Sequence, residues 1–100
     1  MENQPSMGDQ FLTIINQIIE DNIDNEKFSV VDLAKEVGLS RSMLHRKLKK
    51  LAGKPASNYI TEIRLKHAKN LLENDVATVS EIAYRVGFND PSYFTKVFKK

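Results

Sequence analysis

The apolar residues of this chain recur at intervals of three and four positions almost throughout, a spacing that is typical of amphipathic helices. The first helix that this pattern predicts runs from Asp9 to about Asn22, with Phe11, Ile15 and Ile19 along one side. No stretch alternates apolar and polar residues as a strand with one buried face does. The hydrophobic pattern therefore predicts an all-α fold.

Capping residues and glycines indicate where the other helices begin and end. Ser29, with Asp32 three residues further on, is a good start for a second helix, and Gly38 ends it. Ser40 then caps a short basic helix that stops at Gly53. Three more helices are predicted: a connecting helix over about 56–74, one begun by a capping box at Thr78 and Glu81, and a last one capped by Asp90 with Pro91 in its first turn.

The connecting helix is the longest of the set, and it is apolar on two neighbouring sides. A helix of that kind usually packs between two bodies. One side carries Tyr59, Ile60, Ile63 and Leu71, and the other carries Leu65, Ala68 and Leu72.

A short segment of the chain occurs twice. Leu33–Leu39 matches Ile82–Phe88 at every apolar position and at the glycine, 49 residues apart, and an extra Asn89 then makes the offset 50. The apolar pair Leu44 and Leu48 falls on Phe94 and Phe98, and the outward-facing set Ser42, His45, Arg46 and Lys49 falls on Ser92, Thr95, Lys96 and Lys99. The repeat predicts two helix-turn-helix units. The domain plan is a linker over 1–8, a first unit over 9–54, the connecting helix over 55–75 and a second unit over 76–100.

The length of the connecting helix adds a geometric argument. About 19 residues at 1.5 Å each span roughly 28 Å, close to the roughly 34 Å between successive major-groove faces on one side of B-DNA. A rigid helix of that length could hold both recognition helices against adjacent turns of one duplex. One chain would then recognise a site without two-fold symmetry.

Composition and charge narrow the class of protein further. The 100 residues include no cysteine, so disulfides and thiolate metal sites are excluded, and no apolar run approaches the roughly 18 residues that cross a bilayer. No signal segment opens the chain, so we expect a cytoplasmic domain without membrane contact. Residues 1–27 carry six acids and one base, whereas residues 28–100 carry fourteen bases and seven acids. A basic block of this kind favours a polyanionic partner.

These residues resemble the DNA-binding domain of the AraC/XylS family of transcription regulators over nearly the whole of residues 9–100. The matching motifs are Leu-Ala-x-x-Val-Gly-Leu-Ser from Leu33, Tyr-Ile-x-x-x-Arg-Leu-x-x-Ala-x-x-Leu-Leu from Tyr59, and the long block from Val79 through Asp90-Pro91-Ser92-Tyr93-Phe94 to Lys100. Ser40-Arg41-Ser42, with Leu44 to Leu48, is most similar to the output domains of hybrid two-component regulators. Relatives continue with a Phe-Gly-x-x-Pro turn and a further helix after the final lysines. The resemblance therefore implies a fragment of a larger regulator. It also implies that the second unit is incompletely packed, with Tyr93, Phe94 and Phe98 partly exposed.

The resemblance also implies partners and contact residues. The partners are double-stranded DNA, RNA polymerase, and sensor and receiver domains in the full-length protein of this activator class, with no cofactor. The base contacts that it implies are Ser42, His45 and Arg46 in the first unit, and Ser92, Thr95 and Lys96 in the second. An arginine such as Arg46 can fork onto guanine O6 and N7, and this role is favoured over the alternative of a solvated surface charge. Cations expected at phosphates, which set register without specifying sequence, are Arg41, Lys49, Lys50, Lys54 and Lys99.

Other kinds of chemistry find little support in the sequence. The two histidines form no ligand cluster, so we expect no metal site, and His67 is interpreted as a partly buried packing residue. Tyr93, Phe94 and Phe98 are interpreted as core residues rather than as rings that stack on bases. No nucleophile elbow, phosphate loop or paired-carboxylate signature is present, so the chain is not expected to be an enzyme. Two alternatives remain open: a helical protein-interaction module with a basic docking face, and a non-specific nucleoid-type DNA binder, both of which predict sequence-blind binding.

Overall fold

The computed structural model describes residues 6–74, 78–88 and 91–98, and within these ranges all regular secondary structure is α-helical. The predicted all-α class is thus confirmed. Six helices follow one another: α1 (Met7–Asp21), α2 (Val30–Glu36), α3 (Arg41–Ala52), α4 (Ala56–Glu73), α5 (Val79–Arg85) and α6 (Pro91–Phe98).

The helices begin where short polar side chains can accept a hydrogen bond from the first turn. Reciprocal capping boxes join Ser29 to Asp32 and Thr78 to Glu81, as predicted, and Ser40 caps α3. The expectation of an unstructured linker over 1–8 is wrong at its end, because α1 already begins at Met7. The Ser6 hydroxyl accepts a hydrogen bond from the Asp9 amide at 3.0 Å and caps this earlier start. The predicted cap at Asp90 lies outside the described residues.

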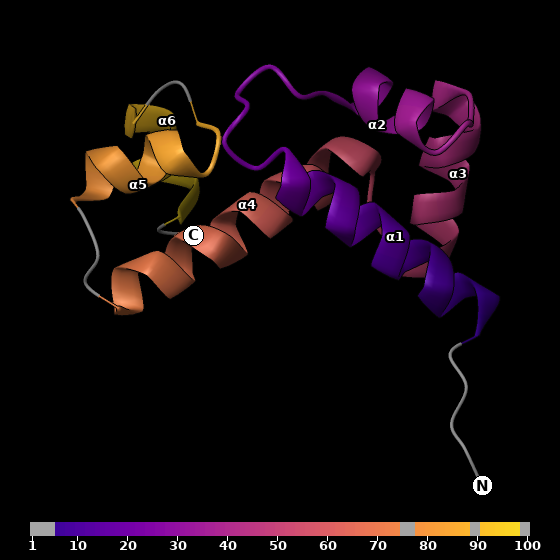
Figure 1. Cartoon of the computed structure of the whole chain (residues 1–100), viewed down its shortest axis with the longest axis horizontal. Helices are drawn as coiled ribbons and strands as arrows, with labels where there is room; N and C mark the ends of the chain where they lie inside the picture. The colour runs from indigo at the N-terminus through magenta and orange to yellow at the C-terminus, as the bar shows by residue number, and fades with distance from the viewer. Residues whose placement is uncertain (1–5, 75–77, 89–90, 99–100) are drawn as a thin grey trace, which may run out of the picture.

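α4 extends across the molecule, with α1, α2 and α3 at one end and α5 and α6 at the other (Figure 1). Two separate core clusters follow this division. The first contains Ile15, Ile19, Phe28, Leu33, Ala34, Leu44, Leu48, Ala56 and Ile60. The second contains Ala68, Ile82, Ala83, Val86, Phe88 and Phe94.

The prediction that the connecting helix packs between two bodies is confirmed, with one correction. Leu71, which the sequence pattern groups with Tyr59 and Ile60, packs against the second core cluster beside Leu65. The reason is that the two units pack against different halves of α4 and not against different faces of it. Its first half, as far as Ile63, serves the first unit, and its second half serves the second.

Candidate DNA-binding surface

The turn between α2 and α3 sets the direction in which α3 leaves the first unit. Gly38 adopts the left-handed conformation, with φ of +71°, that side chains rarely take. The Leu39 amide then donates to the Ala34 carbonyl at 3.0 Å and closes the end of α2. One residue later, the Ser40 hydroxyl accepts from the Met43 amide at 3.1 Å and starts α3. These contacts define the direction in which the basic helix starts.

α3 divides into a buried side and an exposed side, as its sequence predicts. Leu44 and Leu48 are completely buried in the first core cluster. The residues predicted to contact bases, Ser42, His45 and Arg46, are all exposed. Since the apolar side fixes the rotation of the helix about its axis, these three side chains are all available to a partner in solution.

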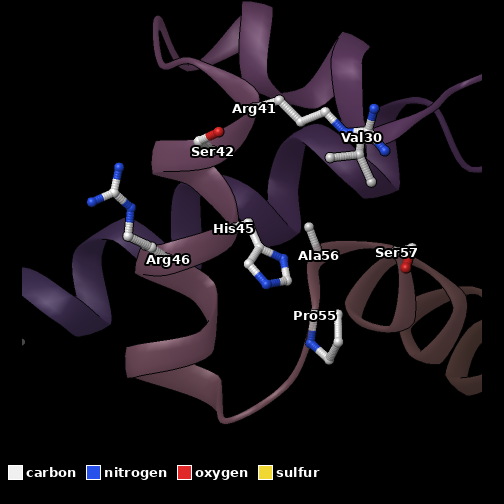
Figure 2. Close-up of a pocket in the computed structure, with 8 residues that line it drawn as sticks. All are labelled: Val30, Arg41, Ser42, His45, Arg46, Pro55, Ala56 and Ser57. Atoms are coloured by element: carbon white, nitrogen blue, oxygen red, sulfur yellow. The ribbon is translucent and has the colours of Figure 1, made fainter.

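An open groove of about 580 Å³ lies between this exposed side and the start of α4. Figure 2 shows the His45 ring directed toward Pro55 and Ala56, whereas the Arg46 guanidinium extends from the opposite side of α3 and Arg41 reaches toward Val30. The three polar groups thus spread along the helix instead of meeting at one point. That distribution suits the edges of several successive base pairs and the adjacent phosphates better than a single small ligand.

The cations expected at phosphates do not share one environment. Arg41, Lys49 and Lys50 are exposed on α3, as a phosphate-binding role requires. Lys54, in contrast, forms an ion pair with Glu62 of α4, with 2.6 Å between Nζ and Oε1. This pair has no signal in the sequence, since the two residues are eight positions apart and the turn at Gly53 brings them together. In this structure Lys54 is therefore paired with a carboxylate, unlike the three cations on α3.

The second unit repeats the turn geometry of the first. Gly87 has φ of +91°, and the Phe88 amide donates to the Ala83 carbonyl at 2.8 Å, as Leu39 does to Ala34. On α6, Ser92 and Lys96 are exposed, which matches their predicted base-contacting role. The Thr95 side chain and Lys99, which complete the predicted set, lie outside the described residues.

The aromatic residues of α6 are only partly where the sequence places them. Phe94 is buried, which confirms its interpretation as a core residue and corrects the partial exposure that the resemblance implied; it packs against Phe88, with ring centroids 5.2 Å apart. Tyr93 is not a core residue: 54% of it is exposed, with its ring at the edge of the cluster, 6.1 Å from that of Phe88. It precedes Phe94 by one position and so lies about 100° round the helix from Phe94, toward solvent. The Phe98 side chain lies outside the described residues.

The structure also shows the surroundings of His67 and the distribution of groups that could bind a metal ion. His67 is partly buried on α4, and its Nε2 lies 3.7 Å from a carboxylate oxygen of Glu20 on α1. The described part of the chain holds no group of three or more His, Cys, Asp or Glu residues that could bind a metal ion. Within that same part, no helix combines the length and apolar character that crossing a bilayer requires.

Two helix-turn-helix units, each ending in a helix with exposed polar and basic side chains, define the helix-turn-helix class of DNA-binding proteins. The Helix-turn-helix domain family matches residues 33–100. The chain belongs to the AraC/XylS family of transcription regulators, within its AraC-type DNA-binding domain. It is therefore a DNA-binding domain of a transcription regulator and not a member of an enzyme family.

Two relatives, a histidine kinase and a transcription activator, each contain a segment similar to this chain. The chain is 42% identical over 95 residues to Histidine kinase P4 of Formosa agariphila, covering 95% of this chain and 7% of the kinase. It is 33% identical over 105 residues to the lactose operon transcription activator of Staphylococcus xylosus, covering 99% of this chain and 38% of the activator. The chain thus spans well under half the length of these relatives.

Solved structures share the fold. The C-terminal domain of the two-component response regulator yesN from Fusobacterium nucleatum superimposes with a TM-score of 0.79 at 33% identity, covering 90% of this chain and 95% of that one. An AraC-type transcriptional regulator from Chromobacterium violaceum gives 0.82 at 33% identity, covering 94% and 84%. Both the recognition of the family and its similarity to two-component output domains are confirmed.

Proposed function

We propose that one chain binds one asymmetric DNA site by inserting α3 and α6 into adjacent major grooves. The observation that carries this proposal is the repeated unit: two turns of the same geometry, each leading into a helix with exposed polar and basic positions, mounted on one α-helix. The 18 residues of α4 span about 27 Å. This length suits the roughly 34 Å between successive major-groove faces on one side of a duplex.

In this proposal the two recognition helices divide their residues between bases and backbone. The base-contacting set is Ser42, His45 and Arg46 on α3 with Ser92, Thr95 and Lys96 on α6. The phosphate-contacting set is Arg41, Lys49, Lys50, Lys54 and Lys99. Arg46 is the residue that we expect to contribute most to sequence discrimination, since its exposed guanidinium can make a bidentate contact with guanine worth about 1–3 kcal/mol.

The experiment that tests this proposal is selection from a random duplex pool at physiological salt, followed by affinity measurements on the selected site. The wild-type domain should enrich an asymmetric motif with two boxes about one helical turn apart. Arg46→Ala should weaken binding to the selected site by about 1–3 kcal/mol and relax the base preference in one box only. Lys49→Ala is the matched control, because it should weaken binding to all sequences equally and reduce the salt slope by about one unit.

The outcomes of this selection separate the alternatives. A single enriched box would refute the insertion of both helices. A protein-docking module or a nucleoid-type binder would enrich no motif, because its affinity for DNA would depend on salt but not on sequence. Equal, uniform losses from Arg46→Ala and Lys49→Ala would contradict the division between base and phosphate contacts.

For the full-length protein we propose a cytoplasmic two-component regulator in which sensor and receiver domains control this output domain. The support is the similarity to Histidine kinase P4 and to the C-terminal domain of the response regulator yesN. We further propose that the bound domain activates transcription through RNA polymerase, in line with the relatives named as transcription activators. A reporter promoter carrying the selected site, with and without the upstream domains, tests both proposals.

A further inference from the structure

Arg64, in the middle of α4, connects this helix to a loop of the first unit. Its Nη2 donates to the Asn25 carbonyl at 2.9 Å and lies 3.5 Å from the Phe28 carbonyl, and both belong to the segment between α1 and α2. Burial lowers the pKa of Arg64, because its charged group has lost much of its contact with water. Main-chain carbonyls in turn stabilise a partly buried guanidinium through charge-assisted hydrogen bonds. Arg64 therefore holds this loop against the middle of α4.

The second unit rests on that same loop through Gly87. In Figure 1 the loop between α1 and α2 reaches toward α5 and α6. A Cβ atom added to Gly87 would lie 2.5 Å from the Ile23 carbonyl oxygen and 2.7 Å from Arg64 Nε, closer than real Cβ atoms approach other atoms. The main chain of Gly87 is thus packed directly on both residues, in a place where no side chain fits.

The first unit provides an internal comparison. Gly38 is the counterpart of Gly87 in the repeat, with φ of +71° against +91°, yet nothing lies within 4 Å of the position that its Cβ would occupy. The left-handed turn alone explains Gly38, whereas Gly87 must satisfy both the turn and a close contact between the units. A substitution at Gly38 therefore tests the backbone conformation alone, whereas a substitution at Gly87 also tests the packing between the units.

Two further features show how closely the units are joined here. The Ile23 side chain packs against both core clusters. The buried Nε of Arg64 has no hydrogen-bond partner among the residues that the structure describes, and it lies 2.7 Å from the position that a Cβ atom on Gly87 would occupy. The contact between the units is therefore a small region with defined geometry, in addition to the shared helix α4.

We propose that Arg64, Gly87 and Ile23 form a junction that fixes the second unit against the first, and that this junction sets the spacing the protein requires between its two DNA boxes. The inference rests on the proposed function, in which α3 and α6 occupy successive major grooves. Arg64 and Gly87 are positioning residues in this scheme. They act on DNA through the placement of α6 and make no contact with bases.

The first test measures the distance between the units without DNA. The chain contains no cysteine, so Lys35→Cys and Tyr84→Cys place spin labels at exposed, equivalent positions of the two units. Electron paramagnetic resonance should give a narrow distance distribution for the otherwise unchanged domain and for Gly38→Asn, because asparagine tolerates the left-handed conformation. Gly87→Asn and Arg64→Met should shift or broaden the distribution. Circular dichroism checks that each variant keeps its helix content, and Arg64→Met carries the test if Gly87→Asn does not fold.

The second test measures spacing on the selected duplex. One added base pair between the boxes turns the second box by roughly 34°. Unsubstituted protein and Gly38→Asn should lose about tenfold or more in affinity on the lengthened site, whereas Gly87→Asn and Arg64→Met should lose less than about threefold relative to their own affinity on the original spacing.

The two tests fail in different ways. Distance distributions that are broad without any substitution, or that stay narrow and unshifted in both Gly87→Asn and Arg64→Met, would overturn the junction. Variants that retain the full spacing preference would overturn its role in DNA recognition. If the unsubstituted domain selects one box alone, both the proposed two-helix function and the control of spacing are refuted. The distances between the spin labels would still decide whether the junction exists.

Discussion

The ion pair between Lys54 and Glu62 predicts that the domain binds DNA less tightly than it would without the Glu62 charge. Lys54 lies at the turn between α3 and α4, next to the groove beside His45, where a phosphate contact is expected. Its Nζ is instead 2.6 Å from Glu62, with the two side chains 35% and 54% exposed. Glu62→Gln removes the competing charge and keeps the shape of the side chain. We expect this variant to bind DNA more tightly.

The size of the effect follows from the exposure of the pair. A solvated ion pair is worth about 0–1 kcal/mol, so freeing Lys54 should raise affinity by at most about fivefold at low salt. One additional phosphate contact also steepens the salt dependence by about 0.9 units, which amounts to an extra loss of about 3.5-fold between 50 and 200 mM salt. The gain from Glu62→Gln should therefore fade as salt rises.

The assay is fluorescence anisotropy with a labelled duplex at several salt concentrations, on a double-mutant cycle of Lys54→Gln and Glu62→Gln. Lys54→Gln should weaken binding less in the unsubstituted background, where Glu62 competes with DNA for the lysine, than in the Glu62→Gln background. It should abolish the gain in the Glu62→Gln background. An equal gain from Glu62→Gln with and without Lys54 would refute the reasoning, because the effect would then be one of net charge alone.

Two predictions concern stability. Phe94→Ala should lower the free energy of unfolding by about 3–5 kcal/mol, because Phe94 is 1% exposed. Tyr93→Ala should lower it by less than about 1 kcal/mol, because Tyr93 is 54% exposed. Denaturant unfolding followed by circular dichroism compares the two variants. The Tyr59 hydroxyl donates to Asn16 at 2.5 Å, so Tyr59→Phe should cost about 0.5–1.5 kcal/mol near neutral pH. Burial raises the pKa of Tyr59 above its usual 10.0, so the folded state holds the phenolic proton more tightly than the unfolded state and stability falls as pH rises beyond that value. The stability difference between the unsubstituted domain and Tyr59→Phe should therefore shrink in alkaline solution, and a constant difference would contradict this assignment.

The parts of the fold that depend on local chemistry could be predicted from the sequence. Ser29, Ser40 and Thr78 begin helices because capping involves atoms only two or three residues apart, and Gly38 and Gly87 adopt the left-handed turn that the repeat predicts. The start of α1 at Met7, two residues before the predicted start at Asp9, follows the same capping rule. Ser6 precedes Asp9 by three positions, as Ser29 precedes Asp32, and that signal was available in the sequence.

The parts that depend on contacts between distant residues could not be predicted. Arg64 meets carbonyls 36 and 39 positions earlier in the chain, and their location depends on a loop with no regular pattern. Tyr93 illustrates a different limit, since an aromatic residue at helical spacing predicts burial without showing how far the core extends around the helix. The exposed positions on α3 were predictable, because the burial of Leu44 and Leu48 determines them.

The two core clusters have a consequence for how the domain unfolds. They are separate bodies of packed side chains that share α4 and the side chain of Ile23. Cooperativity between them depends on these few shared elements, so one cluster can open while the other remains intact. Amide hydrogens of α5 should then exchange through a partial opening, at a free energy below that of α3. In a cell, such an opening would expose Phe88 and Phe94 to proteases, and DNA bound across both units would oppose it by mass action. The lifetime of the domain would in this way depend on whether its site is occupied.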